Sequence, residues 1–577
     1  MKNGATRIQR FIFFRLPGWR ASLLFACMLL SLLALFGRAA YLQLFNTDFL
    51  QDQGNQRYGR KIELPAHRGK LSDRNGASLA VSTPVKAVWV NPASVKASDE
   101  QLQQLARALD MDFPQLQQAL SNKSHDYVSL KRQLPPEQAE LVEQMGVPGV
   151  LLQPEYRRFY PTAEVSAQLI GFTGVDDNGQ EGMELVLQSQ LAGRAGSRRI
   201  LKDRRGHILE DEGSLRQPKP GRDAVLSIDS KIQYIAFREL QNAVMQQHAK
   251  AGSLVVLDTH SGEVLALANY PSYNPNNHER VPTHVMRNRA VTDVFEPGST
   301  MKPFTIATAL EAGLVTPDTS INVQHGSITI SKRTIHDTHK ASVLSVAQVI
   351  QKSSNVGSAK ISLMMQPQTL WNGFSRSGFG EETGSGFPGE SSGKLRDPDT
   401  WRNIEQATMS FGHGISVNLL QLARAYSVFA NQGVLKPVSL LRRDGEVSGT
   451  RAFSEQTALQ VQTMLESVVK PGGTAPLAQV PGYRVAGKTG TAHKLEGRQY
   501  VNRYVASFVG YAPASAPRIV VAVMIDEPSN GAYYGGIVAA PVFSRVTEAV
   551  LRLLEVPTDA PLNNVVNPSK EVIKEEV

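Results

Sequence analysis

A serine and a lysine three positions apart are the first candidates for chemistry in this sequence. Ser299 and Lys302 lie in the segment 296–303, and mainly apolar residues follow as far as Gly313. This pattern predicts a helix that ends at Gly313, and residues i and i+3 lie on one face of a helix. The two side chains would then meet near the helix N-terminus, whose partial positive charge favours an anion. A serine beside a lysine there is a candidate nucleophile with its base.

The spacing alone is weak evidence, because Ser-x-x-Lys also starts at Ser391 and at Ser467, where we interpret it as coincidence. Support comes from two patterns downstream, Ser353-Ser354-Asn355 and Lys488-Thr489-Gly490-Thr491. Lys-[Ser/Thr]-Gly occurs only once in the chain. Ser-x-x-Lys, Ser-x-Asn and Lys-Thr-Gly, in this order, are typical of enzymes that form an acyl-serine intermediate.

Composition limits the other possibilities. A chain of 577 residues with 41% hydrophobic and 20% charged residues is expected to fold into several globular domains. The net charge of +9 comes from basic residues spread along the chain, so we predict no nucleic-acid partner. Cys27 is the only cysteine, which excludes an internal disulfide and a cysteine-based zinc site. We predict no cofactor and no metal.

The N-terminal region predicts a membrane anchor. Residues 1–20 contain five basic residues and no acidic one, residues 21–37 carry no charge, and an apolar stretch continues beyond Arg38 to residue 45. About 20 apolar residues span a bilayer. A cleaved signal peptide is the alternative, but no convincing Ala-x-Ala site is present. We expect a cytoplasmic tail at 1–20, a transmembrane helix at 21–44, and everything after it outside.

Two larger units follow the anchor. Residues 45–222 contain short strand-like runs, helical stretches at 99–109 and 136–145, and no chemical constellation. Arg68-Gly69, the turn 73–76 and the cluster 156–161 are interpreted there as structural. The segment 218–221, rich in proline and glycine, suggests a boundary.

Residues 223–558 form the second unit, and 559–577 are expected to be a flexible tail. The unit begins with a helix around 232–244, which Ser227, Asp229 or Ser230 could cap. The later elements are predicted from the same patterns: a hairpin at 253–258 and 263–268, a helical region to about 470, strands at 483–486, 505–511 and 519–525, and a helix at 541–554. This order predicts an α+β fold with a five-stranded antiparallel sheet covered by helices.

Several long strings together resemble the class B penicillin-binding proteins, and within them the division-specific members of Gram-negative bacteria. The resemblance covers nearly the whole chain, including 68–69, 73–76, 157–161, 271–277, 286–289, 293–302, 352–357 and 487–492. It implies an inner-membrane protein with a periplasmic catalytic domain. It also implies a D,D-transpeptidase that cross-links peptidoglycan stem peptides at the septum and is acylated by β-lactams. Residues 45–222 would be the dimerisation or pedestal domain, and 223–558 the transpeptidase domain.

The resemblance also implies a role for each motif residue. The catalytic group consists of Ser299 as nucleophile, Lys302 as base, Ser353 as proton relay, Asn355 as a holder of the substrate amide, and Lys488 as a source of positive potential. The substrate-binding group consists of Ser354, Thr489, Gly490 and Thr491, with the two threonines binding the substrate carboxylate. The backbone N–H groups of Ser299 and Thr491 would form the oxyanion hole.

Three alternatives remain open from the sequence. A D,D-carboxypeptidase or β-lactamase would use the same acyl-serine with water. The large N-terminal unit argues against it, as do Ser354 at the middle of the second motif and unmatched contexts around Glu390 and Glu405. A penicillin-binding sensor would need more than about 20 internal residues. An elongation-type transpeptidase is disfavoured by the strings 272–277 and 293–302.

Partners and pH dependence complete the expectations. The resemblance implies division-complex membrane proteins, including a glycosyltransferase that polymerises lipid II. One departure from the family is His413, in the string 410–414, where an aromatic residue is usual; His493 follows the third motif. Because histidine titrates near pH 6.5, charge on His413 or His493 could make binding pH-dependent.

Overall fold

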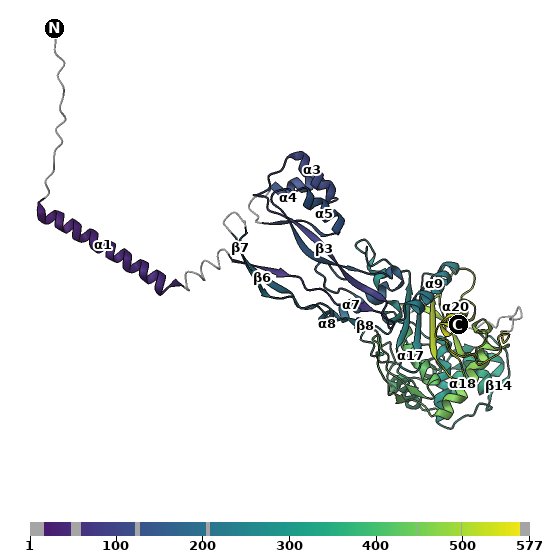
Figure 1. The fold of residues 1–577 in the computed structure, drawn as a ribbon. Helices are drawn as coiled ribbons and strands as arrows, with labels where there is room; N and C mark the ends of the chain where they lie inside the picture. Colours follow the sequence, from purple (N-terminus) through teal and green to yellow (C-terminus); the bar gives the residue numbers. More distant parts are fainter. Residues whose placement is uncertain are drawn as a thin grey trace, which may run out of the picture.

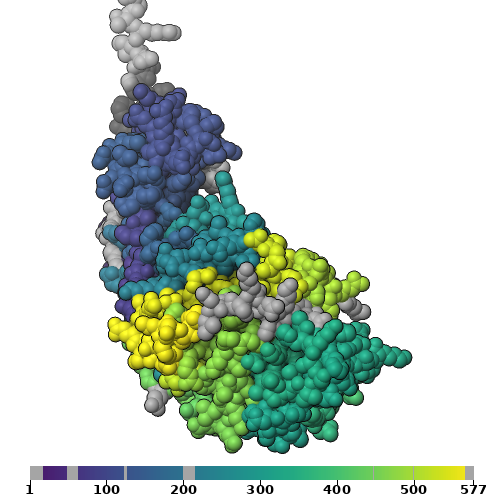
Figure 2. Space-filling view, turned by 90° about the vertical axis from the view of Figure 1, so that its right-hand side faces the viewer, coloured from purple at the N-terminus to yellow at the C-terminus, as the bar shows by residue number. Residues whose placement is uncertain are grey.

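The fold consists of a single N-terminal helix, an elongated β-rich module and a broad C-terminal domain (Figure 1). The computed structural model describes residues 17–47, 59–121, 127–202, 208–445, 447–497 and 499–565. The narrow module and the broad domain below it are also distinct in the space-filling view (Figure 2). This arrangement confirms the predicted α+β class with an elongated N-terminal unit.

Helix α1 (Gly18–Leu44) has 27 residues and none of them is buried. An 18-residue stretch within it has a mean hydropathy of 2.1, and among the described residues this helix alone is long and apolar enough to cross a membrane. At about 1.5 Å per residue, a helix of this length exceeds the roughly 30 Å hydrocarbon core of a bilayer. The coarse expectation of one apolar N-terminal span is therefore confirmed, with the helix beginning at Gly18.

The elongated module contains two sheets. In the first, strand β6 (Gly196–Lys202) lies between β1 (Gly59–Leu64) and β7 (Ile208–Arg216). In the second, β3 (Ser78–Val90) pairs with β5 (Val150–Phe159), β4 (Val128–Leu134) and β2 (Leu71–Ser72). Strand β8 (Ala224–Val225) pairs with β2 in parallel. Helices α3 (Asp99–Ala108), α4 (Phe113–Ser121) and α5 (Pro136–Gln144) cover the far end around a separate small core. Short helices α6 (Ala167–Ile170), α7 (Gly182–Val186) and α8 (Gln188–Leu191) lie nearer the large domain.

Two of the strings that carry the family resemblance, 73–76 and 157–161, join the module to the large domain. Asn75 donates a hydrogen bond to Asp229 at 2.8 Å, and the Asp73 carboxylate accepts one from the Ser230 backbone at 3.1 Å. Asn276 donates to the Tyr160 carbonyl oxygen at 2.9 Å. The turn and the cluster interpreted as structural therefore also help to dock the two parts, since some of their polar groups bond to the neighbouring domain.

The large domain is built on one antiparallel sheet of five strands in the order β10-β9-β19-β18-β17. The strands are β9 (Ala251–Asp258), β10 (Val264–Tyr270), β17 (Ala486–Glu496), β18 (Gln499–Ala512) and β19 (Ile519–Asp526). Every residue of β9 and β19 is buried, which requires helices on both faces. Helices α9 (Ser230–Gln246) and α20 (Ala540–Leu553) pack together on the sheet, and Asp229 caps α9.

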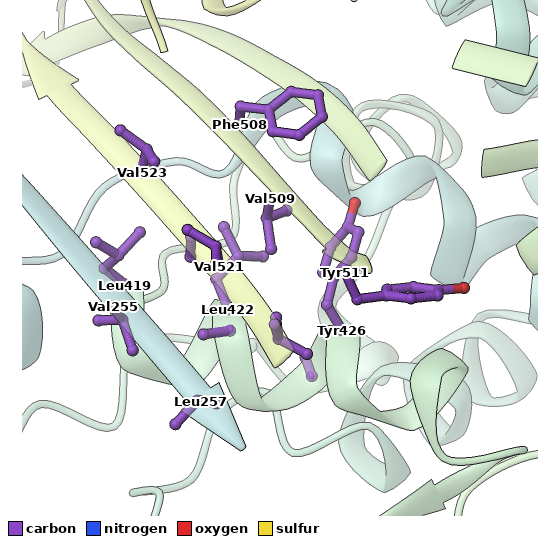
Figure 3. Close-up of a cluster of buried hydrophobic side chains, with 14 of the residues drawn as sticks. Val255, Leu257, Leu419, Leu422, Tyr426, Phe508, Val509, Tyr511, Val521 and Val523 are labelled. Atoms are coloured by element: carbon purple, nitrogen blue, oxygen red, sulfur yellow. The ribbon is translucent and has the colours of Figure 1, made fainter. Parts of the chain in front are cut away.

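Helix α17 (Leu419–Ala430) packs against β9, β18 and β19, and Figure 3 shows the apolar side chains of this contact.

The chain between β10 and β17 supplies the rest of the helical layer: α10 (Thr283–Met286), α11 (Arg289–Thr292), η2 (Gly298–Met301), α12 (Lys302–Glu311), η3 (Gln324–Gly326), α13 (Val346–Lys352), α14 (Asn355–Ser362), α15 (Pro367–Arg376), η4 (Pro398–Thr400), α16 (Asn403–Met409), α18 (Glu455–Val469) and η5 (Pro476–Ala478). It also forms small strand pairs: β11 (Ser320–Asn322) with β14 (Val343–Ser345), β12 (Ser327–Ile330) with β13 (Arg333–His336), and β15 (Val434–Leu435) with β16 (Thr450–Arg451). η1 (Ala163–Val165) and α19 (Gly535–Val538) complete the elements.

The predicted strand at 483–486 is wrong, because the strand runs from Ala486 to Glu496 and contains the whole third motif. Gly487 and Gly490 interrupt the apolar pattern by which a strand is predicted from sequence. A Cβ on Gly490 would lie 2.5 Å from the Ser507 hydroxyl oxygen and 2.8 Å from the Pro297 carbonyl oxygen. Glycine is therefore needed here for close packing, although it weakens a strand by propensity.

The start of the expected flexible tail is ordered by contacts. Asp559 accepts hydrogen bonds from the Arg484 backbone at 2.7 Å and from the Ser515 hydroxyl at 2.7 Å. Asn564 donates to the carbonyl oxygens of Val480 and Tyr483. Residues 559–565 therefore belong to the folded domain, and the remainder of the expected tail, 566–577, lies outside the described residues.

Candidate active site

Ser299 and Lys302 stand at the start of a buried helix. Ser299 lies in the 3-10 turn η2, and α12 begins at Lys302, so the two side chains emerge on one side as predicted. Gly298 takes a positive φ of 56°, and a Cβ there would come within 3.0 Å of the Thr491 carbonyl oxygen. Glycine before the serine thus lets the helix start approach β17.

The Lys302 amino nitrogen is the centre of the site. It lies 2.8 Å from the Ser299 hydroxyl oxygen and 3.1 Å from that of Ser353. It also lies 2.8 Å from the Asn355 amide oxygen and 2.6 Å from the Ser353 carbonyl oxygen. Ser299 is 6% exposed and Lys302 is fully buried. These four partners are uncharged oxygens, and burial favours the neutral form of an amine, so Lys302 is placed to exchange a proton with either hydroxyl.

Ser353 connects the two lysines. It ends α13 in the left-handed region, with φ 61° and ψ 40°, a conformation that costs a non-glycine residue about 1–3 kcal/mol. Its hydroxyl oxygen lies 2.8 Å from the Lys488 amino nitrogen as well as near Lys302. A strained backbone thus holds one hydroxyl between two amino groups, as a proton relay requires.

Ser354 has a different position from its neighbours in the motif. Its hydroxyl accepts a hydrogen bond from the Gly357 backbone at 2.8 Å, capping α14, and donates one to Asp337. The residue is 2% exposed. The Ser354 hydroxyl therefore helps to start the helix that carries Asn355, and its predicted substrate contact stays a prediction.

Asp337 is a residue that the sequence analysis missed. Its second carboxylate oxygen accepts from the Val356 backbone at 2.9 Å, and Asn355 donates to the neighbouring His336 carbonyl oxygen at 3.2 Å. Asp337 follows β13 and lies 17 residues before Ser354. No local motif marks it, since its importance depends on a contact between a hairpin and a helix N-terminus.

The third motif lies on the edge strand β17, which borders the cleft. Lys488 and Thr489 are fully buried, and Thr491 is 4% exposed. The Thr489 hydroxyl lies 3.0 Å from the Lys488 amino nitrogen and 2.9 Å from the Thr474 hydroxyl, a second residue missed from the sequence. An edge strand offers one row of backbone groups to a further chain. The structure therefore joins Ser299, Lys302, Ser353, Asn355 and Lys488 by direct contacts, with Gly490 and Thr491 on the adjoining strand edge.

Two further groups lie beside the nucleophile. Glu296 accepts a hydrogen bond from the Gly414 backbone at 2.8 Å and from the Tyr500 hydroxyl at 3.1 Å, and its burial raises the pKa of this carboxyl. Burial, together with the charges of Lys302 and His493, lowers the pKa of His413 to about 4. This lowered pKa argues against a change of His413 charge between pH 5 and 8, and the pH dependence expected from His413 or His493 stays a prediction.

Comparisons with known proteins agree with this geometry. Residues 252–548 match the family described as penicillin binding protein transpeptidase domain, and residues 63–226 match the penicillin-binding protein dimerisation domain. The chain is 44% identical to the probable peptidoglycan D,D-transpeptidase PenA of Neisseria meningitidis over 92% of this chain and 91% of the relative. It is 42% identical to the peptidoglycan D,D-transpeptidase FtsI of Escherichia coli over 94% and 93%.

A solved structure gives the same result for the large domain. The transpeptidase domain of Burkholderia pseudomallei penicillin-binding protein 3 is 50% identical, with a TM-score of 0.54, and the match covers 58% of this chain and 98% of that one. The family match spans more than half of the chain, and the relatives align almost from end to end. The chain therefore belongs to the penicillin-binding protein transpeptidase family.

Proposed function

We propose that this protein is a peptidoglycan D,D-transpeptidase that cross-links stem peptides at the division septum through an acyl-serine, and that β-lactams acylate the same serine. The observation that carries the proposal is the Lys302 amino nitrogen, 2.8 Å from the Ser299 hydroxyl and 3.1 Å from that of Ser353. One base thus reaches both the nucleophile and the group that can protonate the leaving amine.

The acylation step follows from these contacts. Neutral Lys302 takes the Ser299 proton as the serine oxygen attacks the carbonyl carbon between the last two D-alanines. Ser353 passes its proton to the departing D-alanine amine and is reprotonated from Lys302, so the amide bond breaks as the ester bond forms. An amine from a second stem peptide then attacks the ester, and the same groups work in reverse.

Substrate binding uses the edge of β17 and the start of η2. The hydroxyls of Thr489 and Thr491, with the positive charge of Lys488, would bind the terminal carboxylate. The backbone N–H groups of Ser299 and Thr491 would stabilise the oxyanion. Support comes from Gly298 and Gly490, which bring these two backbones close together.

The cellular setting is part of the same proposal. The apolar helix α1 would anchor the chain in the inner membrane with residues 1–20 inside, residues 45–222 as the pedestal and the catalytic domain, within 223–558, in the periplasm. Division-complex proteins, including a lipid II polymerising glycosyltransferase, would bind the anchor and pedestal. The FtsI name of one relative and the exposed apolar surface of α1 support this setting.

Intact mass measurement tests the chemistry. The purified protein is mixed with benzylpenicillin and followed over hours, with peptide mapping of the adduct. We expect a lasting adduct on Ser299, and none in Ser299→Ala. Rapid loss of the adduct with drug hydrolysis would instead identify a hydrolase, and labelling retained by folded Ser299→Ala would refute the assigned nucleophile.

A further inference from the structure

The strained backbone of Ser353 needs support on both of its sides. A non-glycine residue in the left-handed region persists only where its surroundings hold it there. On the side that follows, the Ser354 hydroxyl supplies this support through its bonds to Asp337 and to the Gly357 backbone. On the side that precedes, Lys352 is the last residue of α13. The contacts of Lys352 therefore bear on the placement of the proton relay.

The Lys352 side chain reaches a loop that is 120 residues away in the sequence. Its amino nitrogen donates a hydrogen bond to the Gly472 carbonyl oxygen at 2.8 Å. Gly472 has a φ of 84°, and a Cβ on Gly473 would lie 2.1 Å from the Val468 carbonyl oxygen, so both positions require glycine. The Ala475 backbone N–H also bonds to the Val468 carbonyl oxygen, at 3.0 Å. The loop is thus held tightly on the end of α18 and offers Lys352 a fixed partner.

These contacts close a ring through the second and third motifs. Two residues beyond the carbonyl that Lys352 binds, the Thr474 hydroxyl lies 2.9 Å from that of Thr489. The Thr489 hydroxyl lies 3.0 Å from the Lys488 amino nitrogen, which lies 2.8 Å from the Ser353 hydroxyl. Lys352 completes the ring, because a peptide bond joins it to Ser353. Its contact with the loop is the link of this ring that contains no catalytic or substrate-binding group.

We propose that Lys352 is a positioning residue for the proton relay. Its ammonium fixes the end of α13 against the loop, and so holds the Ser353 hydroxyl at Lys302 and Lys488 while the leaving group takes its proton. The inference rests on the proposed function, in which Ser353 protonates the departing amine. It adds a residue that controls this step without touching the substrate.

The chemistry of the leaving group distinguishes this role from general support of the cleft. A departing amine, such as the nitrogen of an opening β-lactam ring, must gain a proton as its bond to the carbonyl carbon breaks. A thiol has a pKa near 8.5, so a departing thiolate needs no proton at that moment. A misplaced relay therefore slows acylation by a β-lactam and spares acylation by a thioester, whereas a distorted cleft slows both.

Acylation of Ser299 by two probes in the full-length protein tests the role. Benzylpenicillin and the thioester N-benzoyl-D-alanyl-thioglycolate each carry a carboxylate one carbon away from the leaving atom. Penicillin acylation is followed by intact mass, and thioester acylation by kcat/KM for thiol release. Lys352→Met should slow the penicillin reaction about tenfold, less than the roughly 10²- to 10⁴-fold contribution of a general acid, and leave the thioester reaction nearly unchanged. Lys352→Arg can still donate to the carbonyl oxygen and should restore most of the penicillin rate.

Lys360→Met is the matched control. Lys360, in the later part of α14, donates to the Asn322 carbonyl oxygen at 2.6 Å, so this variant loses a contact of the same kind that lies outside the ring. Both of its rates should equal those of the wild type. Equal slowing of both probes by Lys352→Met, or no slowing of either, would overturn the inference while the proposed function stands. If penicillin fails to acylate Ser299 in the wild type, the proposed function itself is wrong.

Discussion

Two regions of the molecule bury charged groups, and they use them in opposite ways. In the catalytic cleft, Lys302 and Lys488 contact hydroxyl, amide and carbonyl oxygens. In the elongated module, Arg68, Arg158 and Glu184 form a buried cluster, which we call the neck cluster. Arg68 and Arg158 each contact the Glu184 carboxylate, at 2.7 Å and 2.6 Å. All three neck side chains are at most 1% exposed.

The difference follows from what each charge must do. A guanidinium stays protonated at any physiological pH and pairs rigidly with a carboxylate, so the neck cluster keeps its charge and holds segments together. A buried amine among neutral oxygens can lose its proton, so the cleft can transfer one. Both clusters are buried, and the first is structural and the second reactive because the cations and their partners differ.

The largest expected effect, on the rate of acylation, comes from replacing the cleft lysine Lys302 by arginine, the cation of the neck cluster. Lys302→Arg keeps a positive charge but removes the base, and general-base catalysis contributes roughly 10²- to 10⁴-fold. We expect penicillin acylation of Ser299 to slow by about that factor, measured by stopped-flow fluorescence. A near-normal rate in a folded variant would show that Lys302 is not the base.

The next effect removes the carboxylate from the neck. Glu184→Gln leaves Arg68 and Arg158 buried without the carboxylate that both contact directly, and breaking a buried ion pair costs about 3–5 kcal/mol of unfolding free energy. Urea unfolding should show this loss, while penicillin acylation of the folded protein stays unchanged. Glu143→Gln is the control: its ion pair with Lys86 is exposed, and surface pairs contribute about 0–1 kcal/mol. Equal losses in both variants would contradict the structural role of the neck cluster.

A smaller effect on the acylation rate is expected at Asp337, which holds the start of α14 in place. Asp337→Asn weakens the charge-assisted bonds to Ser354 and to the Val356 backbone, and so loosens the placement of Asn355. We expect acylation to slow by about tenfold, roughly 1.4 kcal/mol. Asp444→Asn, at a side chain that is 95% exposed, serves as control. Unchanged kinetics in Asp337→Asn would show that α14 is held without this carboxylate.

The smallest effect concerns His413. Because its pKa is lowered to about 4, the ring carries no charge between pH 5 and 8 and gains a proton only below that range. Acylation profiles of the wild type and His413→Tyr should therefore run parallel from pH 5 to 8. Profiles that diverge near pH 6.5 would restore a role for His413 charge.

Local patterns in the sequence were enough for much of this description. Helical periodicity predicted α9, two short apolar runs on either side of a turn predicted the β9–β10 hairpin, and the apolar N-terminal run predicted α1. Ser299 and Lys302 could be paired because i and i+3 meet within one helical turn. In these cases the interacting residues are neighbours in the chain, so their spacing carries the information.

Tertiary structure alone decided the remaining features. Lys488 meets Ser353 across 135 residues, and Arg68 meets Glu184 across 116. The capping role of Ser354 and the support from Asp337 depend on how a hairpin packs against α14, and β17 is a strand because its glycines fit beneath η2. Such contacts arise from packing between distant segments, and no spacing within one segment encodes them.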